Sequence, residues 1–155
     1  RALEQGLDLM TWTVDPLEAR NAHFNFHKLG AFSRTYRADY YGRMKDSLNQ
    51  GLPSDRLVVE WNLAEPNRRS ELAGEPIRLL SDLAGRPRLQ LHELRQGRPL
   101  AIHVPQAIQV LRRDNPALAL AWRVAVRTAF CAAFDRGYEV HDFRDGAHIL
   151  SEVEG

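Results

Sequence analysis

The sequence predicts an α/β (α+β) fold, a mixed sheet with packed helices, and three observations support this class. The stretch 8–32 has the pattern of a strand, a tight turn, a helix and a terminating glycine. Residues 33–41 are rich in Thr and Tyr, and 57–63 alternate in hydrophobicity, as is typical of strands. A long helical pattern over 115–136 precedes two more alternating segments.

The composition indicates one globular domain of 155 residues, with 44% hydrophobic and 26% charged residues. Its 21 basic and 20 acidic residues give a formal charge of +1, which argues against bulk attraction to nucleic acid or acidic membranes. The single cysteine, Cys131, excludes an internal disulfide and suits the reducing cytoplasm, which is the predicted location. We also expect no membrane span and no signal peptide.

The first predicted unit joins a strand over 9–14 to a helix over 17–29. The strand has an apolar face of Met10, Trp12 and Val14. Asp15-Pro16 ends the strand, and Asp15 can cap the helix that follows. The buried stripe of that helix consists of Ala19, Ala22, Phe26 and Leu29. Gly30 supplies the left-handed residue that ends the helix.

Downstream of this unit, strands over 33–41 and 57–63 are predicted to join 9–14 in one sheet, with the helix 17–29 packed on it. Residues 43–50 have the pattern of a short helix. The polar run 64–76 is the best candidate for a linker, which divides the chain into 1–63 and 77–155.

The segment 77–155 is predicted to add a further α/β part to the same domain. Residues 88–94 and 100–104 alternate on either side of 95–98, which predicts a hairpin. Pro105 begins a short helix to about 113, and Asn115 caps a long helix that Gly137 ends. The buried stripe of the long helix is predicted to be Leu118, Trp122, Ala125, Ala129 and Ala132. Strands over 138–143 and 148–153 close the chain.

Residues 1–63 resemble the carboxyl-terminal half of a GNAT-superfamily acyltransferase. The run Lys28-Leu29-Gly30-Ala31-Phe32 is similar to the K-x-G-F ending of that superfamily's fourth helix. The run TWTVDPLEARNA, with YYGRM and GLPSDRL downstream, resembles one uncharacterised GNAT-like family. The resemblance implies transfer of an acyl group, such as acetyl, from acyl-CoA to an amine of a small molecule or protein, without a metal. It also implies that 57–63 pairs antiparallel with both 9–14 and 33–41.

The chain departs from the superfamily pattern at two positions. Ala19 stands where an Asn often contacts coenzyme A, and Phe26 stands where a Tyr often protonates the leaving thiolate. The alternative function is therefore a non-catalytic ligand-binding or regulatory module. Residues 1–5 have the pattern of a helix end, so we expect a missing upstream segment that carries the pyrophosphate loop. Without it, we expect poor coenzyme A binding and pairing of the 9–14 edge with that segment or with a second copy, giving a homo-oligomer.

The candidate cofactor-binding residues are Asn21, Asn25 and Lys28, with Trp12 and Thr13 at the end of the first strand. Asn21, Asn25 and Lys28 follow at steps of four and three, which places them along one side of a helix. Amide donors and a cation in one groove suit a ligand that has amides and phosphates, as coenzyme A does. The alternative interpretation is a solvated helix face.

Two candidate catalytic residues are Asp15 and Tyr41. Asp15 can orient or deprotonate an attacking amine, and its alternative role is the helix cap. Tyr41 can protonate a thiolate, and so can Tyr36 or Tyr40, but Tyr41 lies on the opposite strand face from those two. Aromatic packing is the alternative for at least two of the three.

The candidate substrate-binding residues are Asp55 and Arg56, which precede a strand and can bind an anionic substrate or pin a turn. His23 and His27 have the i, i+4 spacing of a metal pair, but the sequence shows no third ligand, so we expect no metal. Cys131 is predicted to be a small core residue.

Arg123 and Arg127 share one face of the long helix. We expect that face to be solvated, and the alternative is a phosphate site.

Overall fold

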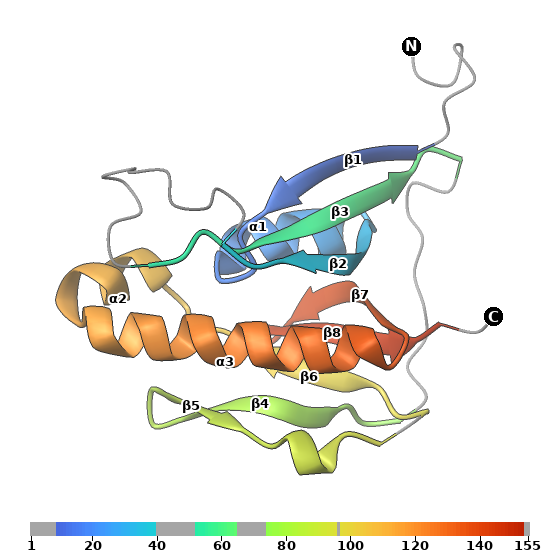
Figure 1. Cartoon of the computed structure of the whole chain (residues 1–155). Coiled ribbons are helices and arrows are strands. Elements are labelled where there is room, and N and C mark those ends of the chain that lie inside the picture. Colours follow the sequence, from blue (N-terminus) through green and yellow to red (C-terminus); the bar gives the residue numbers. More distant parts are fainter. Residues whose placement is uncertain (1–8, 40–51, 65–73, 96, 154–155) are drawn as a thin grey trace.

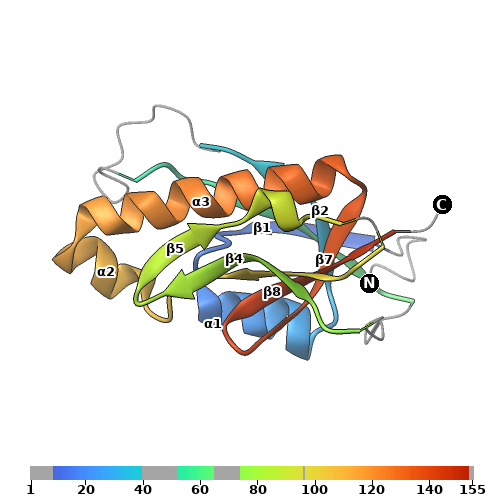
Figure 2. The same ribbon diagram turned by 90° about the horizontal axis from the view of Figure 1, so that it is seen from below.

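The computed structural model describes residues 9–39, 52–64, 74–95 and 97–153, and these form a single eight-stranded mixed sheet packed against helices. The order of strands across the sheet is β1-β3-β2-β7-β8-β6-β4-β5. Figures 1 and 2 show the long helix α3 along one side of the sheet and α1 on the other. The mixed sheet with packed helices is the architecture that the sequence predicts.

The elements, in chain order, are β1 (Leu9–Val14), α1 (Ala19–Ala22), the π-helix η1 (His23–Lys28), β2 (Phe32–Arg37), β3 (Arg56–Asn62), β4 (Ile77–Leu83), β5 (Arg86–Leu89), the 3₁₀-helix η3 (Leu91–Glu93), β6 (Leu100–His103), α2 (Ile108–Asp114), α3 (Pro116–Asp135), β7 (Tyr138–Arg144) and β8 (Ala147–Glu152). The predicted short helix over 43–50 lies outside the described residues.

The first three strands pair as predicted. β3 lies between β1 and β2 and is antiparallel to both, with Leu9 opposite Asn62 and Phe32 opposite Glu60. β2 ends at Arg37, which is earlier than the predicted end at 41, and its pairing with β3 is irregular between Ser33 and Tyr36. The predicted strand was too long because a turn begins at residue 38.

The predicted hairpin of 88–94 with 100–104 is wrong. The hairpin is instead β4 with β5, whose two-residue turn is Ala84-Gly85. The residues after β5 form η3, and β6 then runs parallel to β4, with Ile77 opposite Leu100. Both central turn residues have a positive φ, 53° at Ala84 and 87° at Gly85. Alternation identified β6 and part of β5, but no strand was predicted over 77–83, so β4 and its turn at Ala84-Gly85 were missed.

The turn at Ala84 offers a stability test. A left-handed backbone at a residue with a Cβ costs about 1 kcal/mol, and Asn tolerates it better than Ala. We expect Ala84→Asn to raise the free energy of unfolding by up to about 1 kcal/mol, or the Tm by roughly 2–4 °C. The matched control is Asp145→Ala at the corresponding position of the β7–β8 turn, where φ is 56°. Thermal melts that show a gain in both variants, or in neither, would contradict this account.

The helix α3 begins as the sequence predicts. The Asn115 side chain accepts a hydrogen bond from the Leu118 amide at 3.1 Å, and Pro116 occupies the first turn. Its buried residues are Ala119, Trp122, Arg123, Ala125, Val126, Ala129, Phe130 and Ala133. Of the predicted stripe, Leu118 and Ala132 are only half-buried.

By length and hydropathy, the 20-residue helix α3 is apolar enough to cross a membrane, with a mean hydropathy of 1.5 over an 18-residue stretch. The expectation that no segment has these properties is therefore wrong. The core helix of a folded domain passes the same test, and here α3 packs against the sheet (Figure 2).

The helical segment after β1 is shorter and less regular than predicted. It begins at Ala19 rather than 17, and Asp15 caps the preceding turn, where the Leu17 amide donates to Asp15 Oδ1 at 2.9 Å. From His23 to Lys28 the helix is a π-helix. Gly30 ends it with φ 77°, as predicted. The wider turns place Asn25 on the buried side with Phe26.

Two groups of strands meet at a narrow seam. The strands of residues 9–62 lie on one side and those of 77–152 on the other, and β2 pairs with β7 through one residue pair, Ser33 with Val140. Each group contains three strands that follow the chain order strand, helical segment, strand, strand. In the sheet, the third of these strands lies between the first two, which gives β1-β3-β2 in one group and β6-β8-β7 in the other.

The side chain of His148 fills the core near this seam. Three aromatic rings surround it, with centroids 5.9 Å away for Phe26, 5.0 Å for Phe130 and 4.9 Å for Phe143. Its Nε2 lies 2.8 Å from the Pro16 carbonyl oxygen, to which it donates. Burial lowers the pKa of His148 to about 4, against smaller opposing effects of that hydrogen bond and of Asp15. The imidazole is therefore neutral near pH 7.

Candidate functional site

The predicted cofactor stripe is only partly exposed. Asn21 and Lys28 are exposed, whereas Asn25 is 5% exposed and its amide is already hydrogen-bonded. Asn25 Nδ2 donates to the Asn21 carbonyl oxygen at 2.7 Å, and Asn25 Oδ1 accepts from Trp12 Nε1 at 3.0 Å. The structure thus brings Trp12 and Asn25 together, as a brace between β1 and η1. A solvated face therefore describes Asn21 and Lys28 but not Asn25.

The predicted substrate pair, Asp55 and Arg56, binds two different partners. Arg56 Nη2 donates to the Thr13 carbonyl oxygen at 2.9 Å, and Arg56 Nε donates to Thr13 Oγ1 at 3.3 Å. Asp55 is fully buried and binds Arg127 instead. Neighbouring residues at the start of a strand point to opposite faces, so the two side chains serve different surfaces.

The two arginines of α3 form ion pairs at one end of the sheet. Arg123 binds both carboxylate oxygens of Asp15 at 2.8 Å, and its side chain is 2% exposed. Arg127 binds both oxygens of Asp55 at 2.8 and 2.9 Å. The prediction of a solvated face is wrong for Arg123, because the i, i+4 spacing places both guanidinium groups over aspartates next to β1 and β3. The spacing was the only sequence signal for this network.

Tyr36 completes the network and is a poor proton donor there. Its Oη donates to Asp55 Oδ2 at 2.6 Å. Burial, followed by the Asp55 charge, raises the pKa of Tyr36 far above its ordinary value. Burial tends to raise the pKa of Asp55 as well, but hydrogen bonds from Arg127 and Tyr36 and the Asp39 amide lower it overall. Tyr40 and the predicted acid, Tyr41, lie outside the described residues.

Cys131 is exposed, so its predicted place in the core is wrong. It lies on the outer side of α3, one residue beyond the buried Phe130. Partial burial and the Asp135 charge raise the pKa of its thiol, which argues against an activated nucleophile.

The predicted histidine pair is stacked rather than convergent on a common point. The rings of His23 and His27 are 4.9 Å apart, and His27 Nδ1 lies 2.9 Å from Asp142 Oδ1. Within the described parts of the chain, no group of three or more His, Cys, Asp and Glu side chains fits a metal ion.

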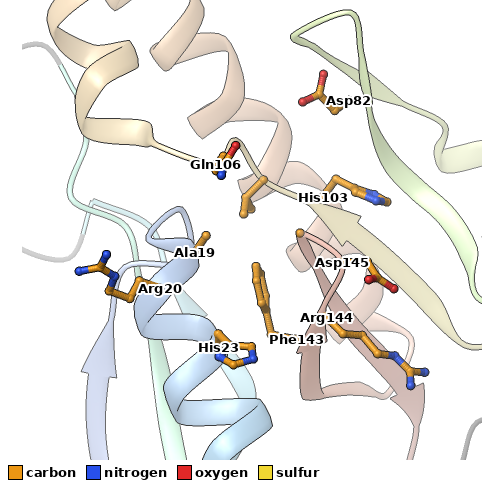
Figure 3. Close-up of a pocket in the computed structure, with 11 residues that line it drawn as sticks. Ala19, Arg20, His23, Asp82, His103, Gln106, Phe143, Arg144 and Asp145 are labelled. Atoms are coloured by element: carbon orange, nitrogen blue, oxygen red, sulfur yellow. The ribbon is translucent and has the colours of Figure 1, made fainter.

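A groove that sequence reasoning missed lies between α1, the end of β6 and the β7–β8 turn (Figure 3). Its cavity has a volume of about 660 Å³, and the side chains around it include Arg20, His23, His103, Arg144 and Asp145. A second cavity of about 360 Å³ shares His103, Arg144 and Asp145 with the first. The Asp145-Gly146 turn is visible in the sequence, but nothing there indicates that it lies near His103.

One ring nitrogen of His103 is hydrogen-bonded, and no described residue bonds to the other. Its Nδ1 lies 3.1 Å from the Leu80 carbonyl oxygen. A carbonyl oxygen only accepts hydrogen bonds, so Nδ1 carries the proton of the neutral ring and Nε2 keeps its lone pair. This tautomer gives the groove a hydrogen-bond acceptor.

Comparisons with protein-family models, curated proteins and solved structures found no match to this chain. Two regions of the described structure are candidates for a functional site. One is the exposed side of α1 and η1, where Asn21 and Lys28 lie, and the other is the groove around His103.

Proposed function

We propose that residues 1–63 correspond to the carboxyl-terminal half of a GNAT-like acyltransferase, which transfers an acyl group from acyl-CoA to an amine, and that 77–155 add a further α/β part to the same domain. The observation that supports the proposal is the order β1-β3-β2, with β3 antiparallel to both neighbours. This pairing is the one that the resemblance of residues 1–63 implies. Under this proposal the protein is cytoplasmic and uses acetyl-CoA or another acyl-CoA as co-substrate.

The reaction requires the amine to attack the thioester directly. Catalysis then depends on positioning, on deprotonation of the amine and on protonation of the thiolate. Asp15 is occupied by Arg123, and Tyr36 donates to Asp55, so neither side chain is available in this arrangement. Tyr41 remains the proposed acid. Asn21 and Lys28 are the exposed groups proposed to bind the amides and phosphates of coenzyme A.

Asn21→Ala tests the proposed cofactor surface. Loss of one hydrogen bond weakens binding by about 1 kcal/mol, so we expect the Kd for coenzyme A to rise about fivefold. Asn21 is exposed, so thermal stability should stay unchanged. Calorimetry should use the protein with any residues that its gene encodes before Arg1.

The control for this experiment is Arg113→Ala, which changes an exposed polar residue on α2. If Asn21→Ala and Arg113→Ala both bind coenzyme A as tightly as the parent protein does, the surface around Asn21 is a solvated helix face and not a cofactor site. Asn25→Ala is a poor test, because the buried Asn25 amide also braces Trp12.

The open edge of β1 is a further element of the proposal. Among the described strands, β1 and β5 are the two edges of the sheet. β5 contains Pro87 between two arginines, a composition that discourages strand pairing, whereas β1 exposes Leu9 and Met10. In a GNAT-like domain another strand lies beside β1, and a segment upstream of Arg1 or a second copy would fill that place.

The second candidate function is a non-catalytic ligand-binding or regulatory module. Two observations favour it: Phe26, at the usual acid position, is 1% exposed, and Asp15 is held in an ion pair. A thiol-release assay with acetyl-CoA and a panel of amines separates the two functions. Tight coenzyme A binding without thiol release would favour the module, and amine-dependent release would favour the transferase.

A further inference from the structure

The two cavities that share His103 form one groove on the side of β4, β6 and β8 that faces away from α3. Its floor is a small apolar cluster, Ala101, Ala147 and Ile149, which is separate from the main core. Ala101 pairs with Ile149, and His103 pairs with Ala147, so the floor and the histidine lie on one sheet face. Two of the three floor residues are alanines, and the cavity above them has a volume of about 360 Å³, near the lower end of the volumes of small-molecule sites.

Charges of both signs line this smaller cavity without neutralising one another. Arg78 and Arg144 are the cations, and Glu75 and Asp145 are the anions. Among the described residues, the one ion pair that involves any of these four joins Arg144 to Asp142 outside the cavity, at a long 4.0 Å. A simple anion would meet two carboxylates here, and a simple cation would meet two guanidinium groups.

A molecule that carries one positive and one negative group satisfies both sets of charges. We propose that the groove binds a small zwitterion, an amino-carboxylate such as a free amino acid with an apolar side chain. Asp145 and the lone pair of His103 Nε2 accept hydrogen bonds from its ammonium group. Arg78 and Arg144 bind its carboxylate, and the apolar side chain lies on the apolar floor.

L-Leucine is the probe for this site, measured by calorimetry on the full chain. Two analogues each remove one charge: N-acetyl-L-leucine has no ammonium, and L-leucinamide has no carboxylate. Each analogue loses hydrogen bonds between charged groups, so we expect each to bind at least about tenfold more weakly than leucine. The measurement contains no acyl donor, so it tests leucine binding independently of acyl transfer. A lack of leucine binding would not contradict the proposed acyl transfer, and a lack of acyl transfer would not contradict the proposed leucine site.

Asp145→Asn is the informative variant, because Asp145 has φ 56° and Asn adopts this left-handed conformation readily. The turn is kept while the carboxylate is lost. We expect leucine to bind about tenfold more weakly and N-acetyl-leucine to bind no more weakly than before. Arg88→Gln, an exposed change on β5 outside both cavities, is the matched control.

Three results would overturn the proposal. The first is the absence of saturable leucine binding at millimolar concentration. The second is equal affinity for leucine and either analogue, which would mean that one charge suffices. The third is unchanged leucine affinity in a folded Asp145→Asn variant.

Discussion

Asp15→Asn is expected to cost about 3–5 kcal/mol of stability, because it leaves Arg123 as a buried, unpaired cation. The Arg123 side chain is 2% exposed, and its Nε already has no hydrogen-bond partner in the described structure. The Asn side chain keeps the Oδ1 atom that accepts from the Leu17 amide, so the turn itself is not the cause. Urea unfolding monitored by circular dichroism measures the loss.

The second half of this experiment adds Arg123→Met to Asp15→Asn. Replacing a buried ion pair by apolar groups is often neutral, so the double variant should recover most of the stability. The control is Arg113→Gln, whose partner Asp114 is exposed, and there we expect a change below about 0.5 kcal/mol. A double variant as unstable as Asp15→Asn would show that the turn, not the buried charge, sets the cost.

Acidification is expected to remove about 3 kcal/mol of stability between pH 7 and pH 4 through His148. Its pKa is about 4 in the folded protein and 6.5 for the free side chain, a difference worth about 3 kcal/mol. The folded-state pKa is the lower one, so the unfolded chain takes up the proton first. This stabilisation is complete above pH 6.5 and is lost as the pH falls toward 4.

The test is the pH dependence of urea unfolding in the parent protein and in His148→Gln. The variant lacks the titrating ring, so its stability should change by about 3 kcal/mol less over this interval. Asp55 affects stability in a lower pH range. Its pKa is lowered in the folded protein, so its contribution to stability is lost only as the pH falls below the ordinary carboxyl pKa of 3.8. Parallel curves for the two proteins between pH 6.5 and 4 would contradict the role of His148.

Local patterns predicted the elements of this fold better than their pairing. The Asn115-Pro116 start of α3 and the Gly30 stop of η1 are fixed by backbone chemistry within a few residues, and both were correct. The partner of β4 depends on a turn at Ala84-Gly85, where Ala has no intrinsic preference for a positive φ. No strand was predicted over 77–83, and the hairpin was assigned to 88–94 and 100–104 instead.

Polar contacts between distant residues were harder to predict than the elements. Arg123 and Asp15 are 108 residues apart in the sequence. No local pattern indicates that their side chains form an ion pair in the fold. The functional roles predicted for Asp15 and Asn25 each require a free side chain, whereas the fold uses both side chains internally. The groove around His103 likewise forms from segments that are separated in the sequence, and only the fold brings them together.

The narrow seam between β2 and β7 makes this sheet resemble two associated partners. One residue pair joins the strands there, so the backbone ladder contributes little to holding the two groups together. The attachment comes instead from side chains: the Arg123 and Arg127 ion pairs and the aromatic rings around His148. The seam has the chemistry of a subunit interface, with packed aromatic side chains at its centre and ion pairs at its margin, although one continuous chain supplies both sides.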